Sequence, residues 1–130
     1  RATLKLSADR AEKRAAHWQA IARAACEQCG RNRVPVVAEP QSLDQWLAGP
    51  PDGVRLMLQP DAAASLLDAA GAQSRIALLI GPEGGFSASE LARATLKGVI
   101  PVRFGPRVLR TETAGLAALA ALNARAGDLR

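Results

Sequence analysis

The sequence predicts a single α/β domain in which helices flank a parallel sheet. Three segments, residues 54–59, 76–80 and 99–104, are apolar almost throughout, which is typical of strands buried on both faces. Helical patterns separate them, as expected where crossover helices connect parallel strands. The chain has 130 residues and is 48% hydrophobic, which is enough for one ordinary core. We therefore expect one compact domain over residues 1–130.

The first part of the chain predicts a long amphipathic helix with a basic surface. Residues 7–30 carry apolar side chains at helical spacing, and Gly30 stands where such a helix ends. Residues 34–38 have the pattern of a short strand, residues 42–47 that of a short helix, and residues 49–53 that of a turn. Basic residues of the helix and of the loop after it include Arg10, Arg14, Arg31 and Arg33.

The middle of the chain alternates between strand and helix. Strand 54–59 precedes a predicted helix at 61–70, and the continuous apolar run 76–80 predicts the next strand. A glycine-rich loop at 81–86 follows that strand directly. Ligands of parallel sheets gather beyond the carboxyl ends of the strands, so this loop is a candidate for chemistry.

The last part of the chain predicts two further helices around strand 99–104. Ser87 begins the first, because Glu90 three residues later completes a capping box. The second, at 113–126, is apolar on nearly every side, so we expect it to be buried in the domain or against a partner.

The net charge and the lengths of the apolar runs indicate which partners and which location to expect for the protein. Seventeen Lys and Arg against twelve Asp and Glu give a formal charge of +5, which attracts a polyanion such as RNA. The apolar runs are far shorter than the ~20 residues that a membrane-spanning helix needs. No secretory signal pattern opens the sequence. We therefore expect a cytoplasmic protein that does not bind a membrane.

Cys26 and Cys29 have the C-x-x-C spacing of a redox pair or half of a zinc site. They stand at the end of a predicted helix, whereas a redox pair normally begins one. A zinc site needs two further ligands, and His17 is the single histidine. We interpret both cysteines as structural thiols and expect no metal.

Two loops carry the residues best suited to chemistry. In the loop that begins at Gly81, glycines allow close backbone approach to a ligand, although a tight turn explains them equally well. The second loop runs from 105 to 113, where Thr111 or Thr113 is expected to cap the last helix and Glu112 suits its dipole. Its two arginines, Arg107 and Arg110, either bind an anion or remain solvated.

Three blocks of residues follow one another in a specific order and spacing. One block is Leu79-Ile80-Gly81-Pro82-Glu83-Gly84-Gly85-Phe86-Ser87 with Glu90, and the next is Phe104-Gly105-Pro106-Arg107-Val108-Leu109-Arg110-Thr111-Glu112-Thr113-Ala114. The third block lies earlier, within residues 18–35, and includes Ala24-Ala25-Cys26-Glu27-Gln28, Arg31, Arg33, Val34 and Pro35. These blocks resemble the RsmE family of ribosomal RNA methyltransferases.

This resemblance implies a SPOUT methyltransferase with a C-terminal trefoil knot, which ordinary connection rules would not predict. It implies a homodimer that transfers a methyl group from S-adenosylmethionine to N3 of a uridine in small-subunit ribosomal RNA. By the same resemblance, the N-terminal RNA-binding domain and the first part of the catalytic domain are absent from residues 1–130. The implied cofactor-binding residues are Ile80, Gly81, Pro82, Gly84, Gly85, Phe104, Gly105, Leu109, Arg110, Thr111 and Thr113.

Methyl transfer to uridine N3 requires loss of the N3 proton and stabilisation of the resulting anion. Arg110 is the first candidate for that stabilisation, and Arg31 of a second subunit is another. Glu83 and Glu112 are candidate bases, although each also has a purely structural explanation. We expect Arg10, Arg14, Arg31 and Arg33 to contact RNA. The alternatives are a non-catalytic RNA-binding or ribosome-assembly module that keeps the fold, and a C-x-x-C redox protein.

Overall fold

The computed structural model describes residues 7–129 of the protein. The described residues are organised as two compact units, one of residues 43–129 and one of residues 7–42, where the sequence predicted a single compact domain. The larger unit contains the sheet. Within residues 7–129 no helix is both long enough and apolar enough to span a membrane.

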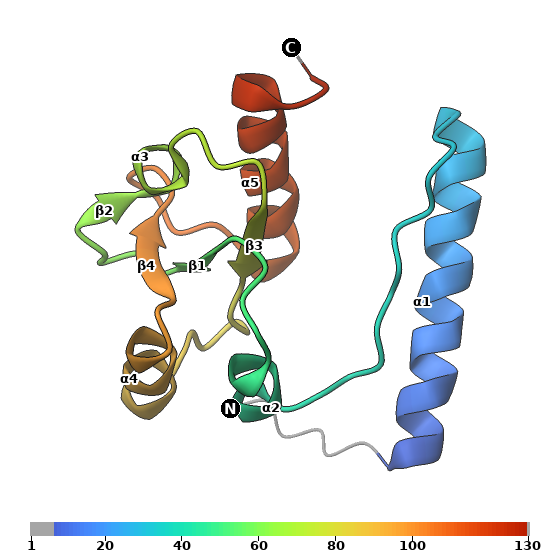
Figure 1. The fold of residues 1–130 in the computed structure, drawn as a ribbon, viewed down its shortest axis with the longest axis horizontal. Helices are drawn as coiled ribbons and strands as arrows, with labels where there is room; N and C mark the ends of the chain where they lie inside the picture. Colours follow the sequence, from blue (N-terminus) through green and yellow to red (C-terminus); the bar gives the residue numbers. More distant parts are fainter. Residues whose placement is uncertain (1–6, 130) are drawn as a thin grey trace. The chain divides into compact units, whose positions relative to one another are not determined.

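The sheet of the larger unit has four parallel strands in the order β2-β4-β1-β3 (Figure 1). Central β1 pairs with β3 in the register Val54↔Ile76 and with β4 in the register Leu56↔Ile100. This arrangement confirms the predicted parallel sheet. The strands are β1 (Val54–Leu58), β2 (Ala64–Ser65), β3 (Ile76–Leu79) and β4 (Ile100–Arg103).

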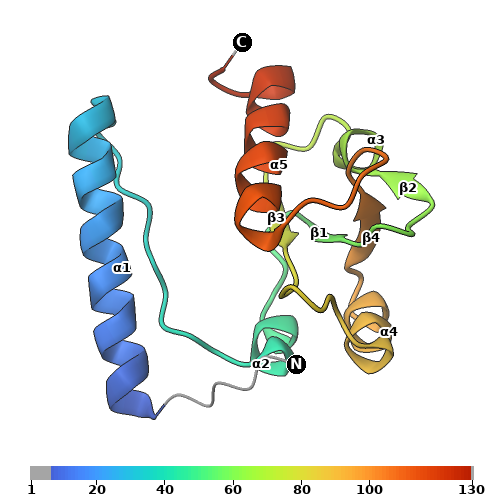
Figure 2. The ribbon, with the colours of Figure 1, turned by 180° about the vertical axis from the view of Figure 1, so that it is seen from behind.

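Helices cover both faces of the sheet (Figures 1 and 2). Neighbouring residues of a strand point to opposite faces, so the fully buried Leu56 and Met57 of β1 belong to different cores. Leu56 packs in the core beneath α3 and α5, and Met57 packs in the core beneath α2 and α4. The covering helices are α2 (Leu43–Ala48), α3 (Leu66–Ala70), α4 (Ala88–Leu96) and α5 (Thr111–Ala126).

Ser87 and Glu90 form the predicted capping box of α4. The Ser87 hydroxyl accepts a hydrogen bond from the Glu90 backbone N–H at 3.1 Å, and the Glu90 carboxylate accepts one from the Ser87 N–H at 3.4 Å. These reciprocal bonds satisfy two of the free N–H groups at the helix start. They also fix the point at which the glycine-rich loop ends.

The predicted helix at residues 61–70 is wrong in its first half. Residues 64–65 form β2 against β4, and α3 begins at Leu66 with Ser65 as its N-cap. The Arg103 guanidinium donates to the carbonyls of Ala62 and Ala63. Sheet pairing and this arginine therefore outweigh the helical pattern of the segment.

The smaller unit contains α1 (Ala8–Cys29), which begins at the N-cap Ser7 and ends at Gly30 as predicted. The strand predicted at residues 34–38 is absent, although the segment is held by a side chain. The Gln19 amide donates to the Pro35 carbonyl at 2.9 Å and accepts from the Val37 N–H at 2.8 Å. Pro35 has no N–H to donate to a strand ladder, so a helix side chain replaces the expected strand partner.

Candidate functional site

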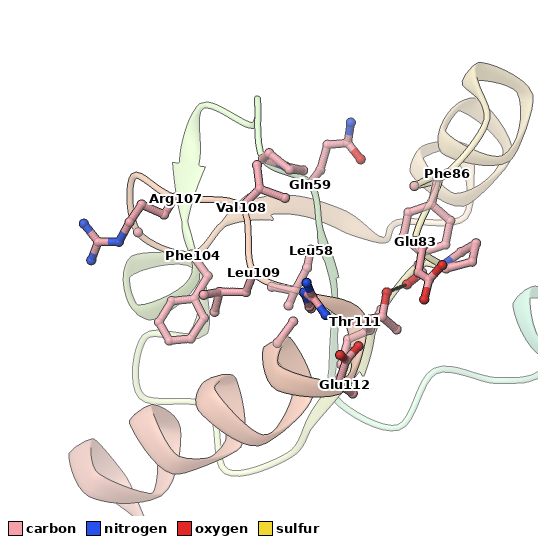
Figure 3. A pocket seen from close by; sticks show the side chains of 18 residues that line it. Leu58, Gln59, Glu83, Phe86, Phe104, Arg107, Val108, Leu109, Thr111 and Glu112 are labelled. Atoms are coloured by element: carbon pink, nitrogen blue, oxygen red, sulfur yellow. Dashed lines mark hydrogen bonds between the residues drawn. The ribbon is translucent and has the colours of Figure 1, made fainter.

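A cavity of about 510 Å³ lies beyond the carboxyl ends of β1, β3 and β4 (Figure 3). Parallel strands end at the same edge of a sheet, and β1 lies between the other two, so the three segments that leave these strands converge. The lining residues are Leu58, Gln59, Pro60, Ile80, Gly81, Pro82, Glu83, Gly85, Phe86, Phe104, Gly105, Arg107, Val108, Leu109, Arg110, Thr111, Glu112 and Ala114.

The segment of residues 58–60 was not predicted as part of the site. Its backbone is fixed by the sheet, because the Gln59 N–H donates to the Val102 carbonyl at 2.8 Å and extends the pairing of β1 with β4. Gln59 thereby lines the cavity. The available signal was the position of this segment directly after a buried strand, the same signal that identified the other two loops.

The apolar part of the cavity wall includes both phenylalanines of the chain, Phe86 and Phe104. The Phe86 ring lies so close to Gly81 that a Cβ atom at Gly81 would be 3.1 Å from the ring. Gly81 is therefore needed for close approach of the ring to the backbone. Gly85 and Gly105 have φ angles of 72° and 70°, which residues with a side chain rarely adopt.

Charged and polar side chains surround this apolar wall. Figure 3 shows Glu83 and Phe86 on one side of the cavity, Phe104 and Arg107 on the other, and Glu112 beside Thr111. The Arg107 guanidinium extends away from the other labelled side chains. An apolar hollow with a few polar groups is typical of small-molecule sites, whose volumes are about 300–1,000 Å³. The arrangement suits a ligand that joins an apolar ring to charged groups.

Thr111 joins two of the loops that form the cavity. Its hydroxyl donates to the Gly81 carbonyl at 3.0 Å, and this contact is partly buried. The prediction that Thr111 or Thr113 caps α5 is wrong. The helix begins at Thr111, two residues earlier than predicted, and its N-cap Arg110 makes no side-chain capping bond. The Thr111 hydroxyl is thus directed to the neighbouring loop.

The family model of an RNA methyltransferase domain matches residues 1–123. The chain belongs to this RNA methyltransferase family. Two curated relatives, both named ribosomal RNA small subunit methyltransferase E, come from Buchnera aphidicola and Bacillus subtilis. The Buchnera protein is 37% identical over 90% of this chain and 48% of its own length. The Bacillus protein is 32% identical over 100% of this chain and 54% of its own length. These relatives confirm the resemblance to the RsmE family.

Solved structures also resemble this chain. A candidate methyltransferase from Legionella pneumophila, in complex with the cofactor SAM, matches with a TM-score of 0.89 and 40% identity over 98% of this chain and 53% of its own. The ribosomal RNA small subunit methyltransferase E of Neisseria gonorrhoeae, bound to S-adenosylmethionine, matches with a TM-score of 0.83 and 40% identity over 90% of this chain and 50% of its own. The chain thus spans about half the length of these relatives.

Most of the residues predicted to bind a cofactor line the cavity, but Gly84 and Thr113 do not. Gly84 is exposed within a turn in which the Gly85 N–H donates to the Pro82 carbonyl at 2.8 Å. Thr113 is exposed two residues after Thr111, so the helical turn directs it to a different side of α5. The predicted residues that line the cavity are Ile80, Gly81, Pro82, Gly85, Phe104, Gly105, Leu109, Arg110 and Thr111.

The predicted catalytic residues fall into two groups. Arg110, Glu83 and Glu112 all line the cavity, so one site brings together a cation and two carboxylates. Arg31 belongs to the smaller unit, where it is exposed. The other arginines predicted to contact RNA are exposed in the same unit: Arg10, Arg14 and Arg33.

The two cysteines, Cys26 and Cys29, are free thiols in different environments. Cys26 is buried, and its thiol donates to the Arg33 carbonyl at 3.8 Å, whereas Cys29 is exposed. A redox pair would require both thiols to be accessible, so the arrangement favours structural thiols. No group of three or more His, Cys, Asp or Glu side chains that could hold a metal ion lies within residues 7–129.

Proposed function

We propose that this chain is the methyltransferase domain of an enzyme that transfers a methyl group from S-adenosylmethionine to N3 of a uridine in small-subunit ribosomal RNA. One observation carries the proposal. The cavity at three strand ends belongs to a fold that is shared, at 40% identity, with two proteins solved with S-adenosylmethionine bound. The proposed domain covers residues 1–130, and an N-terminal RNA-binding domain and the first part of the catalytic domain lie outside it.

The residues of the cavity fit this cofactor. Its volume of about 510 Å³ accommodates a nucleoside with an amino-acid tail. Apolar side chains such as Ile80 and Leu109 would hold the adenine ring, and the glycine loop lets backbone groups approach the ribose closely. The amino-acid tail carries both charges, which match the carboxylates and guanidinium groups at the cavity.

The side chains at the cavity supply the remaining chemistry. When bound, S-adenosylmethionine supplies an electrophilic methyl group on a sulfonium. Glu83 or Glu112 accepts the N3 proton of the uridine, and the N3 lone pair is then free for in-line attack. The Arg110 guanidinium stabilises the negative charge that develops on the uracil oxygens. Arg31 of a second subunit adds to this stabilisation.

The proposed assembly is a homodimer with a C-terminal trefoil knot, as in the SPOUT methyltransferases that the chain resembles. Two features of α5 support the dimer. Leu116 and Leu119 are 73% and 52% exposed, although α5 is one of the most apolar helices of the chain. A second subunit would remove this apolar surface from water.

The proposed substrate agrees with the charge of the chain. The formal charge of +5 and the four exposed arginines of the smaller unit favour contacts with RNA phosphates. An enzyme that modifies small-subunit ribosomal RNA works where ribosomes assemble. We therefore propose a cytoplasmic location.

Calorimetry and a methyl-transfer assay test the proposed function. The 130-residue chain should bind S-adenosylmethionine with one site per subunit. A longer form that includes the preceding domain should transfer labelled methyl groups to small ribosomal subunits that lack the modification, and mass spectrometry should locate them on N3 of a uridine. A chain that does not bind the cofactor contradicts the proposal. Binding without transfer by the longer form favours the non-catalytic module.

A further inference from the structure

The hydrogen bond between Thr111 and Gly81 spans two strands that are not neighbours. Gly81 follows β3 and Thr111 follows β4, while β1 lies between them in the sheet. With strands about 4.8 Å apart, β3 and β4 are roughly 10 Å apart. The bond therefore closes over the end of β1, at one side of the cavity, as the dashed line in Figure 3 shows.

A second contact places the same helical turn against the end of β3. Gly115 is four residues after Thr111, so the two lie on one face of α5. A Cβ atom at Gly115 would be 3.1 Å from the Cδ1 atom of Ile80. The first turn of α5 therefore rests directly on Ile80 and Gly81, and both of these residues line the cavity.

Within residues 7–129, the Gly81 carbonyl is the one hydrogen-bond partner of the Thr111 hydroxyl. The residue is half-buried within the first turn of α5, where a side-chain hydroxyl is not needed for the helix ladder. The hydroxyl therefore links α5 to the opposite loop, although the residue was expected to bind the cofactor. Removing the hydroxyl leaves that partly buried carbonyl without this donor and the two loops without a direct polar link.

We propose that Thr111 is a positioning residue, which holds the β3 and β4 loops in the binding geometry before the cofactor arrives. This proposal rests on the proposed function, because it deepens the account of the same site. A protein that adopts its competent state only part of the time binds more weakly in proportion to that fraction. Loss of the bond therefore lowers the association rate and leaves the dissociation rate unchanged.

The test compares Thr111→Val with Thr111→Ser. Valine keeps the shape of threonine without the donor, and serine keeps the donor. With S-adenosylmethionine as the probe, Thr111→Val should weaken binding about 3- to 10-fold, as expected for one neutral hydrogen bond. The whole change should appear in the association rate, and Thr111→Ser should bind like the unaltered chain.

Thr95→Val provides a matched control. The Thr95 hydroxyl also donates to a backbone carbonyl, that of Leu91 at 2.8 Å, but it lies in α4 and does not line the cavity. This variant should keep the affinity and both rates. Hydrogen exchange without ligand adds an independent readout, because Thr111→Val should speed exchange of the amides at residues 81–86 and Thr95→Val should not.

The outcomes separate this proposal from the proposed function. An unaltered chain that binds no cofactor contradicts the proposed function, and the exchange of the loop amides then still decides whether Thr111 holds the loops. Unchanged exchange and unchanged affinity in Thr111→Val would overturn the positioning role. A faster dissociation rate with an unchanged association rate would also overturn it, because the hydroxyl would then contact the ligand itself. A lower melting temperature with unchanged affinity would show a structural role alone.

Discussion

Single residues set the shape of the cavity through the size of their side chains and through their backbone angles. Gly81 leaves room for the Phe86 ring, and Gly85 adopts a φ of 72° at the cavity itself.

A single arginine is buried elsewhere in the larger unit. Arg55 is only 7% exposed, and its guanidinium donates a hydrogen bond to the Lys97 carbonyl at 2.6 Å. The same guanidinium lies 5.1 Å from the centre of the Trp46 ring. That carbonyl belongs to the C-cap of α4, where the helix dipole favours a cation.

Gly85→Ala should weaken cofactor binding as well as stability. An alanine at a φ of 72° is strained by about 1–2 kcal/mol, and relief of the strain would move a backbone segment that lines the cavity. Isothermal titration with S-adenosylmethionine and chemical unfolding would measure both effects.

Gly98→Ala is the control for this substitution. Gly98 has a φ of 83°, and a Cβ atom there meets nothing within 4 Å, as at Gly85, but Gly98 does not line the cavity. It should lose similar stability and keep its affinity. Equal losses of affinity in the two variants would mean that global destabilisation, and not the loop, weakens binding.

At the scale of the element, α5 has two different sides. Ala114 and Ala118 are buried, and Ala118 packs in the core with Leu56 and Val102. Small side chains on this side let the helix approach the sheet closely. Leucines on the other side remain exposed, so the helix that the sequence described as apolar all round is buried on one side only.

Leu116→Glu should convert the proposed dimer into a monomer. Leu116 is 73% exposed in the single chain, so the charge is compatible with the monomer fold but not with an apolar interface. Analytical ultracentrifugation should show the mass of two chains for the unaltered protein and about half of that mass for the variant. Leu96→Glu, at an 86% exposed position of α4, should leave the dimer intact. A variant at Leu116 that sediments like the unaltered protein would place the interface elsewhere.

Across the whole molecule, arginines occur both at the cavity and in the smaller unit. Arg10 and Arg14 are four residues apart on α1 and therefore share a face, and Arg31 and Arg33 follow in the loop after the helix. All four side chains are exposed. A basic surface of this kind attracts phosphates at long range and depends on salt.

Arg31→Ala should weaken binding to small-subunit ribosomal RNA and reduce the slope of log affinity against log salt by about 1, as loss of one phosphate contact does. Fluorescence anisotropy at several salt concentrations would measure both. Arg75→Ala is the control, because Arg75 is exposed in the larger unit and already forms an ion pair with Asp52 at 2.7 Å. A longer form that includes the proposed N-terminal RNA-binding domain should bind more tightly and with a steeper slope. Equal slopes with and without that domain would place the RNA contacts elsewhere.

Local sequence patterns predicted the features that depend on neighbouring residues. Apolar runs located β1, β3 and β4, the Ser87 capping box located the start of α4, and Gly30 located the end of α1. The glycine-rich loop and the arginine-containing loop were recognised as a site because each follows a buried strand. These features are local, since hydrogen bonds and side-chain contacts within a few residues produce them.

Contacts between segments far apart in the chain could not be predicted from local pattern. The strand order places β1 between β3 and β4, which brings Gln59 into the cavity and the Thr111 hydroxyl to the Gly81 carbonyl. Pairing with β4 made residues 64–65 a strand, and the Gln19 amide took the place of a strand partner for residues 34–38. The physical reason is that local pattern leaves strand order open, while long-range hydrogen bonds and burial on both faces of the sheet select one order.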